Sequence, residues 1–192
     1  MLSSKIWGVH QKELRITYPC DKYFLKNSHA YYRGVTIKAN AKFVYLWLCQ
    51  MNYAPYSYDW LDNFGFESPS YLIKGADKLT IGQKFMYAFK LLDFKKNEHI
   101  TFTPLPHHIL DRLYGQFVVS YFINKVNSDR TRLIVKIRWS YPKGIIGLIL
   151  SYLAPKMDLI MMRKQLSQFK KFSEKNQLEY ESKSSNESIS VK

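Results

Sequence analysis

The sequence predicts an α+β domain in which a curved antiparallel β-sheet packs against a long C-terminal helix. Hydrophobic residues make up 46% of the 192 residues, which is enough to form a globular core. Segments in the middle of the chain alternate between apolar and polar residues, as strands do. Near the end of the chain, apolar residues recur at helical spacing instead. A sheet covered by one long helix is the simplest arrangement that buries both apolar faces.

The first third of the chain predicts one strand followed by two short helices. Residues 1–31 are polar and irregular, and we expect them to pack on the domain as an N-terminal segment. Residues 33–39 alternate and predict the first strand. Asn40 is a suitable N-cap for an apolar helix that runs to about Met51. A second short helix is expected to begin at Ser57 and to end at Gly65.

Further strands are predicted over residues 84–93, 98–103, 117–124 and 132–139. The last two are expected to form a hairpin through the turn at residues 127–129. Residues 132–139 show the clearest alternation, with apolar side chains on one face and basic side chains on the other. The basic face carries Arg132, Lys136 and Arg138. Because the apolar face is expected to point inward, these basic side chains should point outward into solvent; an inward arginine would instead bind a carboxylate or phosphate.

The end of the chain predicts one long helix and a tail. Pro155 suits a first helical turn, and Asp158 is favourable near the positive end of a helix. An apolar stripe then continues to about Lys175. Beyond it the sequence is polar and Ser-rich, which predicts a disordered tail. The expected organisation is therefore a segment over 1–31, a domain over 32–175 and a tail over 176–192.

The charge balance favours anionic partners but not a nucleic-acid groove. The formal net charge is +14, from 29 Lys and Arg against 15 Asp and Glu. No dense basic run concentrates this charge, and the nearest are the pairs at residues 95–96 and 170–171. We therefore expect a generally basic surface, with weak contact to an anionic membrane as one partner and nucleic acid disfavoured.

Cysteine content and hydropathy indicate a cytoplasmic protein. Cys20 and Cys49 are isolated, which predicts neither a disulfide framework nor a zinc site. The first 14 residues lack the apolar stretch of a signal peptide. The longest apolar run, residues 145–154, is shorter than the ~20 residues of a membrane-spanning helix.

No common nucleotide, metal or hydrolase motif is present, and we expect neither a cofactor nor a metal. The sequence contains no phosphate-binding loop, no H-E-x-x-H, no C-x-x-C and no G-x-S-x-G. The adjacent pair His107 and His108 follows Pro104 and Pro106. Neighbouring side chains diverge, so this pair is read as part of an exposed loop and not as a metal site.

Several segments resemble a bacterial branch of the START-like, or SRPBCC, superfamily. They are the first strand, the helix carrying Trp47-Leu48-Cys49-Gln50-Met51, and the segment Tyr56-Ser57-Tyr58-Asp59-Trp60-Leu61. Residues 79–83, 131–133 and 157–163 add supporting matches, and the resemblance covers residues 17–175. It implies a helix-grip fold with a deep cavity between sheet and helix. Relatives include lipid-transfer domains, Bet v 1-like plant proteins, aromatic polyketide cyclases and a ubiquinone-binding protein.

The sequence then predicts the walls of a cavity. The chain contains 15 Tyr, 12 Phe and 4 Trp, which indicates either a bulky core or a cavity lined with rings. The residues expected to line the cavity come from the tyrosine-rich segment, the inward strand positions and the last helix: Tyr56, Tyr58, Trp60, Tyr87, Phe89, Tyr121, Val135, Ile137, Trp139, Met162, Leu166 and Phe169. Asp59 is a candidate general base if burial raises its pKa, and otherwise a cap or a partner for an arginine.

Three classes of function remain. The first is a protein that binds or carries a hydrophobic, lipid-like or aromatic molecule. The second is an enzyme that acts in the same cavity, such as a polyketide cyclase or dehydrase. The third is a basic protein that binds an anionic membrane or nucleic acid through its surface.

Overall fold

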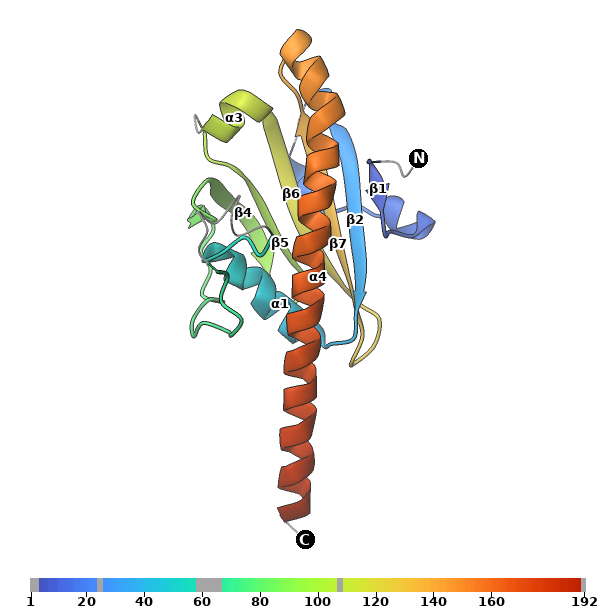
Figure 1. Cartoon of the computed structure of the whole chain (residues 1–192), viewed down its shortest axis with the longest axis vertical. Coiled ribbons are helices and arrows are strands. Elements are labelled where there is room, and N and C mark those ends of the chain that lie inside the picture. Colours follow the sequence, from blue (N-terminus) through green and yellow to red (C-terminus); the bar gives the residue numbers. More distant parts are fainter. Residues whose placement is uncertain (1–3, 24–25, 58–66, 107–108, 191–192) are drawn as a thin grey trace.

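The computed structural model describes residues 4–23, 26–57, 67–106 and 109–190, and within these it shows a curved sheet gripping one long helix (Figure 1). The strands are β1 (Ile6–Trp7), β2 (His29–Ile37), β3 (Lys84–Phe85), β4 (Phe89–Lys95), β5 (His99–Pro104), β6 (Gln116–Lys125) and β7 (Thr131–Ser140). The helices are α1 (Ala41–Cys49), α3 (Ile109–Tyr114) and α4 (Ile145–Ser190). Short 3₁₀ turns cover Gln11–Leu14, Pro19–Lys22 and Gln50–Asn52.

The strands form a single sheet in the order β1-β2-β7-β6-β5-β4-β3. All neighbouring strands are antiparallel except β1, which pairs parallel with β2. The helix α4 crosses the concave face of the sheet and packs against β2 and α1 (Figure 1). This confirms the predicted α+β class and the predicted wrapping of a sheet around the last helix.

Two predicted elements have different bounds. Residues 84–93 do not form one strand, because Met86 and Tyr87 adopt positive φ angles of 44° and 58° and turn the chain between β3 and β4. The last helix begins at Ile145 instead of near Pro155, and it continues to Ser190 where a disordered tail was expected. Pro155 therefore lies inside α4, ten residues after its first residue. The second short helix, predicted over residues 57–65, falls almost entirely outside the described residues.

The N-terminal segment covers the convex face of the sheet, and this corrects the prediction that the basic face of β7 is solvated. Arg132 is buried and forms an ion pair with Glu13, with 2.7 Å between Nη2 and Oε2. Lys136 is buried and pairs with Asp21, with 2.7 Å between Nζ and Oδ1. Arg138 donates to the Tyr23 carbonyl. The basic side chains do point outward, as predicted, but the chain before β2 supplies their partners.

Glycine permits the close approach of this segment to β2. A Cβ at Gly34 would lie 2.9 Å from the carbonyl oxygen of Gly8 and 2.8 Å from Nη2 of Arg132. Gly8 itself has a φ of +69°, which favours glycine. The backbone of residues 8–9 can therefore lie directly on the strand.

Candidate functional site

The concave face of the sheet is lined by alternate residues of the central strands. The register pairs Phe117 with Trp139 and Tyr121 with Val135 across β6 and β7. These side chains point toward α4, where Leu166 and Phe169 are fully buried. The space between sheet and helix is thus the place in which the sequence predicted a ligand.

Between Tyr121 of β6 and Phe169 of α4, this space is filled by a packed core. The Tyr121 ring lies 6.4 Å from the Phe169 ring and 5.8 Å from the Phe102 ring, measured between centroids. The Tyr121 hydroxyl donates to Gln165 and lies 3.5 Å from the sulfur of Met162. Ring distances of this kind are contact distances, so these side chains fill the grip at this level.

The predicted cavity residues fall into four groups. Those buried in the core between sheet, α1 and α4 are Tyr56, Tyr121, Val135, Ile137, Trp139, Met162, Leu166 and Phe169. Phe89 is half-buried and packs on this core. Tyr87 was wrongly predicted as an inward position, because it lies in the β3–β4 turn with 64% of its surface exposed. Tyr58, Asp59 and Trp60 lie outside the described residues, as do His107 and His108.

Aromatic side chains also line the other end of the grip, where α4 begins. Several of them are only half-buried. We call this region the aromatic end and define it by Tyr31, Phe89, Phe117, Trp139 and Tyr141. The rings form a chain of contacts: 6.1 Å from Phe89 to Phe117, 5.1 Å from Phe117 to Trp139 and 5.0 Å from Trp139 to Tyr141. Phe89, Phe117 and Tyr141 keep part of their surface exposed. These rings therefore form an apolar surface that is partly open to solvent.

A buried polar cluster lies beside the aromatic end. Arg33, on the inner face of β2, is fully buried and pairs with Asp158 of α4, with 2.8 Å between Nη2 and Oδ2. Its Nε atom is buried and has no hydrogen-bond partner among the described residues. The hydroxyl of Tyr141 donates to that of Tyr31 at 3.0 Å. Arginine, carboxylate and phenols therefore meet inside a largely apolar interior.

Sequence reasoning missed this cluster, although the sequence carried one signal for it. Arg33 alternates in register with Val35 and Ile37, so it shares the face of β2 that ends in a fully buried isoleucine. A charged residue on that face implies a buried charge and a partner. The partner, Asp158, was assigned to a helix terminus, because the helix was expected to begin at Pro155.

Burial governs the acid–base properties of the cluster. It raises the pKa of Asp158 to about 6, and the attraction of Arg33 only partly offsets this effect. Burial also raises the pKa of Tyr31 and of Tyr141. The tyrosines therefore stay protonated, while the carboxyl titrates near neutral pH.

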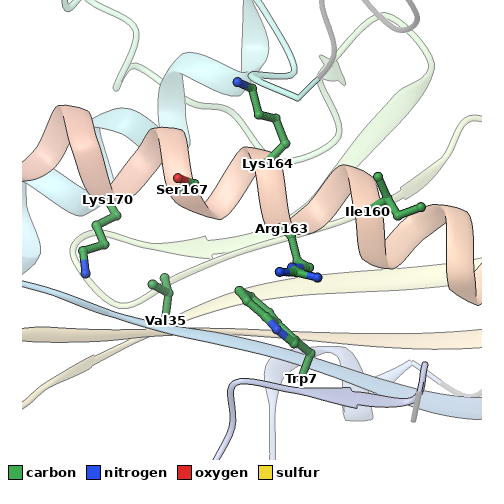
Figure 2. Close-up of a pocket in the computed structure, with 7 residues that line it drawn as sticks. All are labelled: Trp7, Val35, Ile160, Arg163, Lys164, Ser167 and Lys170. Atoms are coloured by element: carbon green, nitrogen blue, oxygen red, sulfur yellow. The ribbon is translucent and has the colours of Figure 1, made fainter. Parts of the chain in front are cut away.

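A shallow groove of about 540 Å³ lies between α4 and the edge of the sheet formed by β1 and β2 (Figure 2). Its lining residues are Trp7, Val35, Ile160, Arg163, Lys164, Ser167 and Lys170. The guanidinium carbon of Arg163 lies 5.4 Å from the centre of the Trp7 ring. Figure 2 shows Arg163 and Lys170 directed toward β2, whereas Lys164 points away from it. This groove is separate from the aromatic end and is strongly basic.

Within the described part of the chain, no group of three or more His, Cys, Asp or Glu side chains is placed to hold a metal ion. Cys20 and Cys49 are buried and unpaired, and burial raises the pKa of Cys20 to about 11 and that of Cys49 to about 12. Both thiols are therefore in the protonated, weakly reactive form at neutral pH.

By length and composition alone, α4 is long and apolar enough to cross a membrane, and 22% of its most apolar stretch is buried. Its Met162, Leu166 and Phe169 are nevertheless buried against the sheet. The helix is thus the central helix of this fold. The cytoplasmic location stays a prediction.

Comparison with known proteins finds similar folds among solved structures but no related sequence. No family model and no curated protein sequence matches this chain. Among solved structures, a protein of Mesorhizobium loti is similar with a TM-score of 0.51 and 12% identity, covering 75% of this chain and 96% of that one. The di-domain ARO/CYC protein StfQ of the steffimycin biosynthetic pathway has a TM-score of 0.50 and 11% identity, covering 78% of this chain and 51% of that one.

Identities this low show shared architecture alone. The curved sheet, the crossing of α4 over its concave face and the likeness to these structures agree with one another. The chain therefore has the helix-grip fold that its resemblance to the START-like superfamily implies.

Proposed function

We propose that this protein binds a hydrophobic small molecule with one polar end, at the aromatic end of the grip. The apolar body of the ligand would lie on the half-buried rings of Phe89, Phe117 and Tyr141. Burial of apolar surface there contributes about 25 cal/mol per Å², before the costs of ordering are subtracted. The packed core around Tyr121 forms the floor of the site.

The observation that carries the proposal is the polar cluster beside the rings. A fully buried arginine is costly unless its donors are paired, and within the described part of the chain Nε of Arg33 has no hydrogen-bond partner. An oxygen of the ligand, such as a carboxylate or carbonyl, would satisfy it. The phenols of Tyr31 and Tyr141 would orient the same oxygen. This chemistry suits a fatty acid, a quinone or an oxygenated aromatic compound.

The comparisons add support of a general kind. StfQ, an ARO/CYC protein from the steffimycin biosynthetic pathway, shares the fold. The START-like resemblance likewise implies binding of small hydrophobic molecules. Both favour a small-molecule site over a surface that only binds nucleic acid.

A matched pair of phenylalanines tests the proposal. Phe117 and Phe122 are both half-buried on β6, but Phe117 faces the grip and Phe122 faces the convex side, where its ring lies 5.5 Å from that of Tyr18. Fatty acids, quinones and polyaromatic compounds are titrated against intrinsic tryptophan emission. We expect saturable binding that Phe117→Ala weakens about tenfold and that Phe122→Ala leaves unchanged.

Circular dichroism of both variants provides the folding control. Equal weakening by the two substitutions would show that stability and not ligand contact is being measured. Absence of saturable binding across all three compound classes would exclude the proposal.

The Asp158 carboxyl favours a second candidate, an enzyme that uses the same site. A pKa of about 6 lets this group accept and return a proton near neutral pH. A cyclase or dehydrase that acts on the poly-β-ketone precursor of an aromatic compound needs such a group. Incubation with poly-β-ketone analogues, followed by mass spectrometry, should give a cyclised or dehydrated product that Asp158→Asn abolishes. If the wild-type protein leaves the compounds chemically unchanged, the enzyme candidate is excluded and binding remains the proposed function.

A further inference from the structure

The outward face of the first half of α4 is apolar, which is unusual for a helix at the surface of a protein. Between Ile145 and Ile160 the outward positions include Ile146, Ile149, Tyr152, Leu153, Met157 and Ile160. Their exposed fractions lie between 47% and 68%. Monomeric proteins rarely expose contiguous apolar surface of this kind without a partner.

The character of this outward face changes abruptly at Arg163. From there to Lys175, the exposed positions are polar, and they are occupied by Arg163, Lys164, Ser167, Lys171 and Lys175. Lys156 is the one basic residue within the apolar stretch, and its Nζ lies 3.4 Å from the centre of the Tyr152 ring. One helix thus presents an apolar surface that is bordered directly by positive charge.

The helix α3 lies at the same end of the molecule and carries exposed apolar residues of its own (Figure 1). Ile109 and Leu113 are four residues apart, so they share one face of α3, and they are 61% and 54% exposed. Gly115, just after α3, approaches the Ser140 carbonyl so closely that a Cβ would lie 2.3 Å from it. The end of α3 is therefore fixed against the connection that leads into α4.

We propose that this surface, formed by the first half of α4 and by α3, docks on an anionic phospholipid membrane. The apolar side chains would enter the boundary between headgroups and acyl chains, and the basic residues from Arg163 onward would contact the phosphates. Tyr152 and Lys156 suit this boundary, because each combines an apolar stem with a polar end.

The helix lies on the membrane and does not cross it. Residues 145–160 extend over about 22 Å, which is shorter than the ~30 Å of a hydrocarbon core. The ion pair between Asp158 and the buried Arg33, together with buried Met162 and Leu166, holds α4 on the sheet. Withdrawing the helix from the sheet would break that pair and expose the core.

The net charge of the chain favours a membrane over a second copy of this chain as the partner of the apolar face. Two copies joined through this face would bring together chains of net charge +14, whose basic residues border the contact. An anionic bilayer neutralises the same charge. The apolar surface and its basic border therefore fit an anionic lipid surface better than they fit the same surface of a second copy.

A vesicle flotation experiment with the full chain tests this proposal. The vesicles are made of phosphatidylcholine alone or of phosphatidylcholine mixed with anionic phosphatidylglycerol. Ile149→Glu places a charge in the apolar face, and Val126→Glu is the matched control, since Ile149 and Val126 are 52% and 54% exposed. Val126 lies in the β6–β7 turn, at the opposite end of β6 from α3.

We expect the wild type and Val126→Glu to float with the anionic vesicles, and Ile149→Glu to bind at least about tenfold less. Binding to phosphatidylcholine alone should be weaker for all three proteins. Equal binding by the two variants would overturn the proposal, because charge alone would then explain the attachment, and so would a lack of flotation by the wild type. A wild-type dimer that Ile149→Glu dissociates, seen by sedimentation without lipid, would assign the face to self-association instead.

Discussion

The ion pair between Arg33 and Asp158 connects the inner face of β2 to the middle of α4. Arg33 also donates from Nη1 to the carbonyls of Lys5 and Tyr32, so its guanidinium links β2, α4 and the residue just before β1. Alternation along β2 places Arg33 on the buried face, which the sequence alone could have indicated. Its partner could not be predicted, because the two residues are 125 positions apart and the helix was expected to start later.

The pKa of Asp158 should be measurable directly. Its folded value of about 6 lies above the ordinary 3.8, so between these pH values the folded chain holds a proton that the unfolded chain has released. The carboxyl therefore makes folding less favourable as the pH rises from about 4 to about 6. Carbon-13 NMR titration of the Asp158 carboxyl should give a midpoint near 6, and a midpoint at or below 4 would show that Arg33 outweighs burial.

The pair between Glu13 and Arg132 allows a second residue-scale prediction. Burial acts to raise the pKa of Glu13, but the bonds from Arg132 and from the His10 N–H outweigh it, so the pKa is lowered. Glu13→Gln would leave Arg132 buried without its counter-charge, and we expect a loss of about 3–5 kcal/mol in unfolding free energy. The double variant Glu13→Leu with Arg132→Met should recover most of it in urea unfolding. A loss below about 1 kcal/mol for the single variant would show that the pair is effectively solvated.

At the scale of elements, α4 differs most from its prediction. Its apolar stripe was read correctly from residues 159–169, since Leu166 and Phe169 are fully buried. Its start was misjudged because Pro155 was read as a first-turn residue. Its end was misjudged because polar composition indicates disorder only where no contact holds the chain. The structure supplies such contacts: Asn176 accepts from the Trp47 indole at 2.8 Å, and Gln177 accepts from the Asn40 N–H at 3.0 Å.

Two truncations should distinguish the docked part of the tail from the rest. Ending the chain after Ser182 keeps both contacts and the ring contact of Tyr180 with Phe43, so the thermal midpoint should stay within a few degrees. Ending it after Lys175 removes all three. Two hydrogen bonds at about 1 kcal/mol each correspond to a fall of about 4–8 °C in a domain of this size. Equal midpoints in calorimetry would mean that this part of α4 contributes nothing to stability.

At the scale of the whole molecule, the sequence identified the grip but not how its interior is divided. Strand alternation correctly directed Tyr121, Val135 and Ile137 toward α4. Whether such side chains enclose a cavity or pack on one another depends on ring-to-ring distances that periodicity does not contain. The 5.8 Å and 6.4 Å contacts of Tyr121 place the core there and move the candidate site to the half-buried rings at the aromatic end.

The four tryptophans of the chain provide the most direct test of ligand binding at that end. Trp139 belongs to the aromatic end and donates its indole N–H to the Tyr114 carbonyl at 2.7 Å. Trp47 lies between α1 and α4, and Trp7 lines the groove between α4 and the β1–β2 edge. In a nitrogen-15 NMR titration with a fatty acid, followed by a quinone and a polyaromatic compound, each tryptophan gives its own indole signal. We predict that at least one compound moves the Trp139 signal saturably while those of Trp7 and Trp47 stay in place. A Trp139 signal that never moves, or one that moves only together with Trp7 and Trp47, would contradict the account.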